Sequence, residues 1–182
     1  KNGGFSEVDE DGAVPLHWAI PPASAALYRA VNVDGMSGAD SFRYRAEVAV
    51  PSRPATQAYT CKANTDYVLT AALKGDGTTT PSVLITTPDG KTRAVQLSSK
   101  QTKWKRLQAR FNSGGATQFV VQLLGSAEMS RKPVATVGSS WFDDVQVYSQ
   151  ADAPPEAGAD TPFTAPGPNL ALHAPYKLTP PP

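Results

Sequence analysis

Hydrophobic and polar positions alternate with a period of two along several short segments of residues 1–149. In the segment 42–48, apolar side chains at every second position alternate with Arg, Arg and Glu, and the segment 67–74 alternates in a similar way. Successive side chains of a β-strand point to opposite faces of a sheet. The alternation therefore predicts strands, each with one face toward a core.

Six further segments are candidate strands, and turn sequences such as PDG at 88–90 and SGG at 113–115 separate them. These segments are 55–62, 82–87, 92–97, 103–112, 117–124 and 140–148. Only 126–132 has the sequence of a helical turn, and no segment sustains a period of 3.6 residues. The pattern therefore predicts an all-β protein, an antiparallel β-sandwich or jelly roll.

Proline marks a change of character after residue 149. Of the 17 prolines, nine follow Ser149. Residues 150–168 are rich in Pro, Ala, Gly and acid, which predicts a linker in extended conformation. Residues 169–182 regain some leucine and tyrosine, and we interpret them as the start of a following domain. We therefore expect a sandwich module at 1–149 within a longer modular protein.

Charge and hydropathy exclude several functions. The 17 Lys and Arg residues balance 16 Asp and Glu residues, so the net charge is +1 and nucleic acid is a poor partner. No apolar run approaches the roughly 18 residues that span a bilayer, so we expect no membrane partner.

Side chains for catalysis are scarce. Cys61 is the one cysteine, and His17 and His173 are the two histidines, which excludes an internal disulfide and metal sites of several cysteines. No Ser lies in a GxSxG sequence, and the acidic run 9–11 is typical of a solvated turn. We expect Cys61 to be a buried small residue, and we expect this chain not to be an enzyme.

Five motifs in order carry a family resemblance. They are NGGF at 2–5 followed by Glu7, SGADSFRYR at 37–45, NTDYVLTAALK at 64–74, KWKRLQARF at 103–111 and WFDDVQVY at 141–148. Together they resemble the galactose-binding-like jelly rolls of carbohydrate-binding module families 4, 9, 16 and 22. Ser6 departs from the NGGFE opening of those families. Separately, residues 169–182 are similar to the opening strand of discoidin-like (coagulation factor 5/8 type C) domains.

The acidic pair in the last motif is a candidate metal site. Regular alternation would place Asp143 on the core side with Val145 and Val147, and Asp144 on the other side with Phe142. A carboxylate at the core edge needs a positive partner, and a hard cation with oxygen ligands is one such partner. The alternative is that Asp143 caps a turn or pairs with a surface Arg or Lys.

The family resemblance makes this cation a structural calcium ion, Ca2+. It implies ligation by Asp143, by carbonyl oxygens from Gly4 to Glu7 with the Glu7 carboxylate, and by the carbonyl of Gly38 or Asp40. Removing the metal should then lower the melting temperature.

Sugar binding needs flat aromatic faces and planar polar side chains. The candidate ligand-binding residues are Trp18, Tyr28, Arg43, Arg45, Tyr59, Gln122 and Trp141. Trp18 and Tyr28 lie in predicted loops, where aromatic side chains often contact a ligand, although Trp18 could instead cover the sandwich edge. Arg43 and Arg45 could instead form a solvated face with Glu47. Trp104 is expected in the core or at its rim.

The sequence therefore favours a non-catalytic module that binds polysaccharide. The resemblance implies a larger secreted or cell-surface bacterial polysaccharide-degrading protein, with a catalytic domain in the same parent chain. The alternative is a structural, spacer or protein-interaction sandwich with no sugar site.

Overall fold

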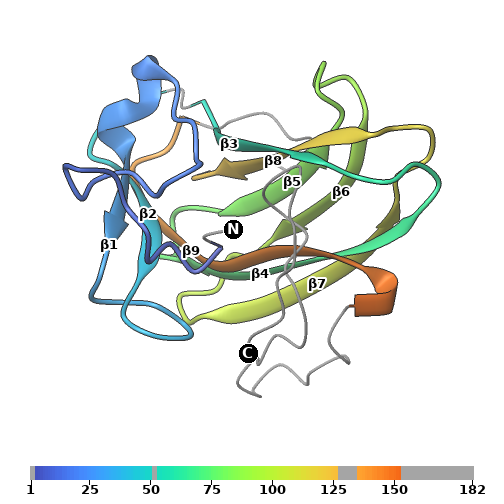
Figure 1. Cartoon of the computed structure of the whole chain (residues 1–182). Helices are drawn as coiled ribbons and strands as arrows, with labels where there is room; N and C mark the ends of the chain where they lie inside the picture. Colours follow the sequence, from blue (N-terminus) through green and yellow to red (C-terminus); the bar gives the residue numbers. More distant parts are fainter. Residues whose placement is uncertain (1–2, 51–52, 127–134, 153–182) are drawn as a thin grey trace.

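The structure is a computed structural model that describes residues 3–50, 53–126 and 135–152. In these residues it contains nine strands and two short 3-10 helices (Figure 1). The elements are η1 (Pro22–Leu27), β1 (Tyr28–Val31), β2 (Ser41–Ala46), β3 (Ala55–Thr60), β4 (Asp66–Gly75), β5 (Ser82–Thr86), β6 (Arg93–Ser98), β7 (Lys105–Asn112), β8 (Gln118–Leu124), β9 (Gly138–Ser149) and η2 (Gln150–Asp152).

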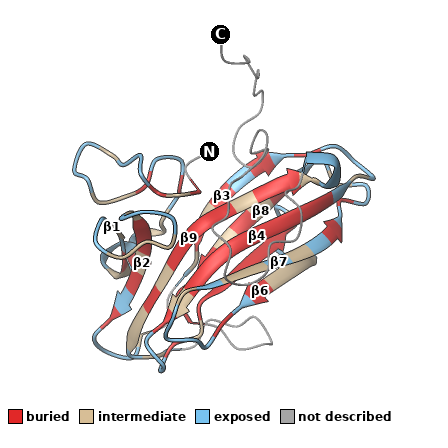
Figure 2. Ribbon diagram, turned by 90° about the horizontal axis from the view of Figure 1, so that it is seen from below, coloured by how far each residue is buried: buried red, intermediate tan, exposed pale blue. Residues whose placement is uncertain are grey.

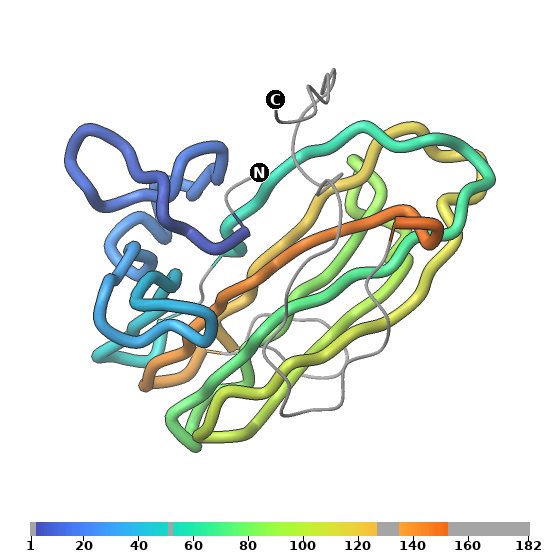
Figure 3. Tube along the Cα trace, turned by 60° about the horizontal axis from the view of Figure 1, so that its bottom comes forward, coloured from blue at the N-terminus to red at the C-terminus, as the bar shows by residue number. Residues whose placement is uncertain are grey.

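The strands form two sheets that lie face to face. One sheet has the order β1-β2-β9-β4-β7 and the other has the order β3-β8-β5-β6. All the strand pairings in both sheets are antiparallel. Figures 1 and 3 show the two layers of this sandwich. The predicted antiparallel β-sandwich of the jelly-roll type is confirmed.

The predicted strands coincide closely with eight of the nine observed ones. The exception is β1, which the sequence analysis did not predict because the four residues YRAV are too short to show an alternation. The helical turn predicted at 126–132 falls outside the described residues except for Ser126. The predicted linker and following domain, 150–168 and 169–182, also lie outside them from residue 153 onward.

The core lies between the inner faces of the two sheets (Figure 2). Phe42, Leu69 and Phe142 of the five-stranded sheet and Ile85 and Leu123 of the four-stranded sheet are each 0% exposed. Cys61 is buried with them, as predicted. Burial of such large apolar side chains is the main stabilising contribution to a fold of this kind.

None of the helices in the described ranges is long and apolar enough to cross a bilayer.

The N-terminal segment lies against β9. The amide of Val145 donates a hydrogen bond to the carbonyl oxygen of Gly3, 3.0 Å away. A Cβ on Gly3 would lie 2.1 Å from the Val145 carbonyl oxygen, so only glycine allows this approach. Phe5 then enters the core and stacks on Phe42 with 5.4 Å between ring centroids. In the NGGF opening, Gly3 and Phe5 therefore have structural roles.

A bulge in β9 changes the predicted orientation of the acidic pair. The pairing of β9 with β4 shifts register between Thr70 and Ala72, and Asp144 has a positive φ of 49°. An extra residue in one strand breaks the alternation of faces. Phe142 is therefore a core residue together with Val145, and the prediction that it shares the face of Asp144 was wrong.

Candidate functional site

The outer face of the five-stranded sheet carries a row of five large side chains. They are Arg29 on β1, Arg43 on β2, Trp141 on β9, Lys74 on β4 and Trp104, which immediately precedes β7. Arg29 is opposite Arg43, Arg43 is opposite Trp141, and Trp141 is opposite Lys74. The pairing of β4 with β7 continues the row to Trp104. We call these five residues the Trp141 row.

Two indole rings of this row flank the Lys74 ammonium group. The Lys74 Nζ lies 4.8 Å from the centroid of the Trp141 ring and 6.0 Å from that of Trp104. These distances are within the range of cation–π attraction. Both tryptophans are half-buried, so part of each ring faces outward.

Strand alternation explains why these side chains point away from the core. Phe42 and Phe142 point into the core, so their neighbours Arg43 and Trp141 take the outer face. Trp104 and Phe111 are seven positions apart, which for a regular strand means opposite faces. Phe111 is buried in the core and Trp104 lies on the other side, so no bulge is needed between them.

The loop 32–40, which joins β1 to β2, closes one side of the row. The Asp34 carboxylate accepts hydrogen bonds from Lys74 Nζ and, at 3.1 Å, from Trp104 Nε1. The Ser41 hydroxyl donates to the Asp34 carbonyl oxygen at 2.8 Å and fixes the start of the loop. Asp34 thereby sets the position of the ammonium group and of one indole ring.

A second contact fastens the same loop over the bulge. Arg106 Nη2 lies 2.8 Å from an oxygen of Asp144 and donates to the Ser37 hydroxyl at 2.9 Å. The Ser37 hydroxyl also hydrogen-bonds Asp144. Asp144 and Arg106 are both largely buried, with side chains 11% exposed, so this ion pair is shielded from solvent. The loop is thus held at two points on the sheet.

Several polar atoms on this face are buried without a hydrogen-bond partner. Among the described residues these are Arg43 Nε, Thr70 Oγ1 and Gln146 Oε1, and Thr70 is directly opposite Gln146 in the strand register. Buried polar groups are usually paired because leaving them unpaired is costly. Such atoms are suited to hydrogen-bond a ligand laid on the sheet.

The predicted ligand-binding residues do not all lie together. Trp141, Arg43 and Arg45 share the outer face of the five-stranded sheet, and Arg45 pairs with Glu47 at 3.0 Å. Gln122 lies on the other sheet, where its side chain donates to Thr86 Oγ1 at 3.0 Å.

Three predicted aromatic ligand residues are instead core residues. Trp18, Tyr28 and Tyr59 are 5%, 2% and 4% exposed. Trp18 packs on Phe5, and Tyr28 stacks on Phe42 and donates its hydroxyl proton to the Leu123 carbonyl. The expectation that Tyr28 is an exposed loop residue was wrong, because Tyr28 begins β1 and faces the core. Trp18 is buried beside Phe5 and Phe42, which favours the alternative that it covers the sandwich and not a ligand contact. Tyr59 points inward from β3, against Phe119.

Five residues that complete the face were not predicted as ligand-binding residues. One of them is Trp104, which was expected in the core or at its rim and lies half-buried on the outer face. Lys74 follows the outward positions of β4, so the alternation itself could have indicated it. Arg29 lies in the strand that was not predicted. Asp34 and Arg106 reach the site through tertiary contacts for which the sequence carries no signal.

Asp143 lies beneath the loop 32–40, where it is 1% exposed. Its Oδ2 accepts hydrogen bonds from the amides of Met36 and Ser37 at 2.8 and 3.1 Å, and its Oδ1 accepts from the Asp144 amide. Burial, followed by the neighbouring Asp144 carboxylate, raises the pKa of Asp143 from 3.8 to about 6. A cation beside this carboxylate would relieve that penalty.

The backbone of two segments bears on whether calcium could bind beside Asp143. A Cβ on Gly4 would lie 4.0 Å from Asp143 Oδ1, so the Gly4 backbone is close to the carboxylate. Within the loop 32–40, the carbonyl oxygens of Gly38 and Asp40 lie close to Gly35, where a Cβ would be 2.7 and 2.3 Å from them. Carboxylate and backbone carbonyl oxygens are the donor types that a hard cation prefers.

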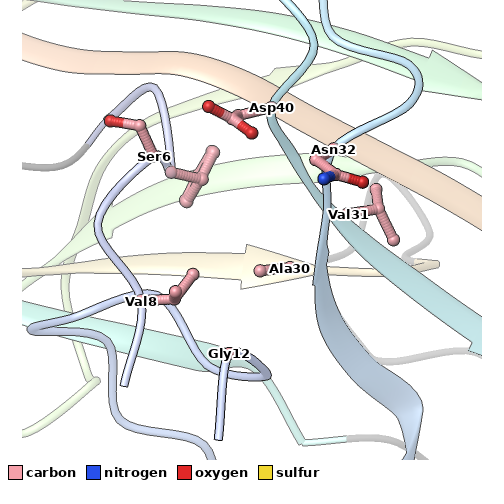
Figure 4. A pocket seen from close by; sticks show the side chains of 8 residues that line it. Ser6, Val8, Gly12, Ala30, Val31, Asn32 and Asp40 are labelled. Atoms are coloured by element: carbon pink, nitrogen blue, oxygen red, sulfur yellow. The ribbon is translucent and has the colours of Figure 1, made fainter. Parts of the chain in front are cut away.

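Asp40 and Glu7 are the other side chains predicted near the metal. The side chain of Asp40 faces a neighbouring pocket that Ser6, Asn32 and Val31 also line (Figure 4). Glu7 is exposed. The described parts of the chain contain no group of three or more His, Cys, Asp or Glu side chains able to hold a metal ion, so a cation here would depend on backbone carbonyls.

Solved structures share this fold. A carbohydrate-binding module of family 4 aligns with a TM-score of 0.57 and 16% identity, covering 82% of this chain and 99% of that one. The family 61 module TmCBM61, solved with β-1,4-galactotriose, aligns with a TM-score of 0.55 and 14% identity, covering 82% and 97%. The CBM22-1 xylan-binding domain from Paenibacillus barcinonensis Xyn10C aligns with a TM-score of 0.53 and 13% identity, covering 80% and 90%.

These likenesses establish the fold, a jelly roll of the kind found in carbohydrate-binding modules. No protein-family model and no curated protein matches the sequence.

Proposed function

We propose that this chain is a non-catalytic carbohydrate-binding module that holds a polysaccharide on the outer face of its five-stranded sheet. The observation that carries the proposal is the pair of outward-facing tryptophans, Trp141 and Trp104, on either side of Lys74. Indole faces stack on the apolar faces of pyranose rings, and polar groups beside them can bond the hydroxyls. The similar structures include modules described as binding galactotriose and xylan, which supports a sugar ligand.

The charge pairing on this face argues against hydrolysis there. A glycosidase needs two carboxyl groups placed across the bond to be cleaved, one acting as an acid. Asp34 and Asp144 are the carboxylates beside the row, and each is neutralised by a cation. They are suited to fixing the loop 32–40 rather than to moving protons.

We extend the proposal to the parent protein. A module that binds polysaccharide would keep a linked catalytic domain close to its substrate, which raises the effective concentration without new chemistry. We propose such a setting for this chain, a secreted or cell-surface bacterial protein that degrades polysaccharide. The expected affinity is micromolar to millimolar, about −4 to −8 kcal/mol.

We also propose a structural calcium ion between the N-terminal segment and the loop 32–40. Asp143 would supply its carboxylate, and the backbone near Gly4 and the Gly38 and Asp40 carbonyls are the further donors. The ion would neutralise a buried charge and tie the loop to the sheet. Because Glu7 is exposed, we leave its carboxylate out of the proposed ligand set.

The rival function is that of a structural or protein-interaction sandwich. The burial of Trp18 and Tyr28 removes two of the aromatic residues that were expected to contact sugar, which favours this rival. The Trp141 row favours sugar binding, because a spacer has no need for two half-exposed indole rings on one face.

Affinity electrophoresis of the full chain in gels containing xylan, β-1,4-galactan, polygalacturonate or dextran sulfate tests the proposal. We expect retardation in at least one gel, and loss of that retardation in Trp141→Ala. Gln122→Ala, on the outer face of the other sheet, is the control and should migrate like the wild type. No retardation in any gel would support the structural role instead.

A further inference from the structure

Two arginines at one end of the Trp141 row face each other without an acidic partner. Arg29 and Arg43 are directly opposite in the register of β1 and β2, and both point to the outer face. In the described part of the chain, no ion pair or side-chain hydrogen bond joins either of them to another residue. Like charges directly across two strands repel each other and destabilise the sheet.

Three other cations of this face each pair with a carboxylate. Lys74 pairs with Asp34, Arg106 pairs with Asp144, and Arg45 pairs with Glu47. Arg29 and Arg43 differ from these three in having no such carboxylate. This difference leaves a local excess of positive charge on a protein whose net charge is only +1.

Burial adds a second, independent observation. The Nε of Arg43 is buried and has no hydrogen-bond partner. A guanidinium donor that is removed from water and left unpaired is costly, and an anion placed against it removes that cost. The planar fork of arginine matches the geometry of a carboxylate or a sulfate, with two parallel hydrogen bonds.

The position of the pair links the anion to the sugar. Arg43 is directly opposite Trp141, so a group held by the two arginines lies next to the indole ring. An anionic substituent on a sugar stacked on Trp141 would reach the guanidinium groups. A neutral sugar in the same place would leave the two like charges uncompensated.

We propose that the ligand of this face is an acidic polysaccharide, whose carboxylate or sulfate groups bind Arg29 and Arg43 while a sugar ring stacks on Trp141. This inference rests on the proposed function, because it names the substrate class of the same site. It excludes neutral xylan and galactan as the preferred ligands. It also predicts that binding weakens as salt is added, since exposed charges are screened.

Matched pairs of polymers test the charge requirement with the full chain. Polygalacturonate is compared with highly methyl-esterified pectin, and dextran sulfate is compared with dextran, so that each pair shares its backbone and differs in charge. We expect at least tenfold tighter binding to one of the acidic polymers than to its neutral counterpart. The acidic polymer that binds more tightly shows whether the arginines prefer a carboxylate or a sulfate group. Either result supports the proposal.

Amino-acid substitutions distinguish binding at Arg29 and Arg43 from a non-specific attraction of acidic polymers to any positive charge on the protein. Arg43→Gln and Arg29→Gln should each weaken binding to the preferred acidic polymer about tenfold. Arg43→Lys should restore only part of the affinity, since it keeps the charge but loses the planar fork. Lys91→Gln is the control, because it makes the same charge change at an exposed turn between β5 and β6 and should leave binding unchanged.

Three outcomes would overturn the inference. Equal or tighter binding of the neutral polymers, or of xylan or galactan, would refute it while the proposed function stands. An equal loss of affinity in Lys91→Gln and Arg43→Gln would show a non-specific charge effect. Absence of binding to every polymer would refute both proposals. Melting temperatures of all variants confirm that each protein is folded before binding is measured.

Discussion

The outer faces of the two sheets differ although similar alternating sequences build both. On the four-stranded sheet, Gln122 bonds Thr86 and Gln96 bonds Ser82, so these polar side chains are hydrogen-bonded within the sheet. On the five-stranded sheet, indole rings and guanidinium groups protrude and several buried polar atoms remain unpaired. The difference shows that strand alternation specifies a sandwich, whereas the choice of outward residues makes one face suited to a ligand.

The largest expected effect is a loss of stability, and it should differ between two neighbouring residues of β9, one in the core and one on the outer face. Phe142→Ala removes a fully buried ring, so we expect the free energy of unfolding to fall by about 3–5 kcal/mol. Its neighbour Trp141 points outward, and Trp141→Ala should lower that free energy by no more than about 1 kcal/mol. Urea unfolding of both variants measures the contrast, and equal losses would refute the assigned orientations.

The next effect concerns Asp143 and the proposed calcium ion. Without a cation, the raised pKa of about 6 means that the folded state holds its proton more tightly than the unfolded state, whose value is near 3.8. The free energy of unfolding should therefore fall as the pH rises from about 4 to 7, by about 3 kcal/mol in total. Calcium should abolish that fall by keeping the carboxylate ionised.

Unfolding of metal-free and calcium-loaded protein across this pH range measures the effect. Asp143→Asn is the control and should show neither the pH-dependent fall nor stabilisation by calcium. Identical profiles with and without calcium in the wild-type protein would contradict the proposed ion.

Removal of the indole ring from the outer face should affect binding more than stability. Trp141→Ala should weaken binding of the preferred polysaccharide by about tenfold to a hundredfold, or 1–3 kcal/mol. Gln122→Ala on the opposite face should leave affinity within about twofold of the wild type. Quantitative affinity electrophoresis gives both values, and an equal effect of the two variants would remove the distinction between the faces.

The smallest effect is expected at the loop 32–40. Asp34→Asn breaks an ion pair whose side chains are 22% and 33% exposed, so the stability loss should be about 0.5–1 kcal/mol. Binding should fall about twofold to fivefold, because Lys74 and Trp104 lose their common anchor. Calorimetric melting and the same electrophoresis check both numbers, and an unchanged affinity would show that the loop does not position the row.

The sequence was informative wherever local pattern decides the structure. Alternation located eight strands and the outward position of Arg43. The opening NGGF motif contains Gly3, a position where the close approach of Val145 leaves no room for a side chain. The face of Phe142 was assigned incorrectly because a bulge depends on the register of two strands, which one strand's sequence does not reveal.

Tertiary contacts account for the other differences. Trp18 lies in an irregular segment and Tyr28 begins the short strand β1, and nothing in their local sequence shows that both side chains enter the core. The contacts of Asp34 with Lys74 and Trp104 join residues 40 and 70 positions apart. Such a site becomes visible only when strand order is known.

The most direct test of the central claim uses the three tryptophan indole N–H signals in a nitrogen-15 NMR spectrum. Trisaccharide fragments of polygalacturonate and of xylan are titrated in turn into the labelled full chain. The account predicts that the signals of Trp141 and Trp104 shift with at least one fragment, while the signal of Trp18, which lies in the core, stays in place. A shift of Trp18 without the other two, or shifts confined to residues such as Gln122 on the opposite sheet, would contradict it.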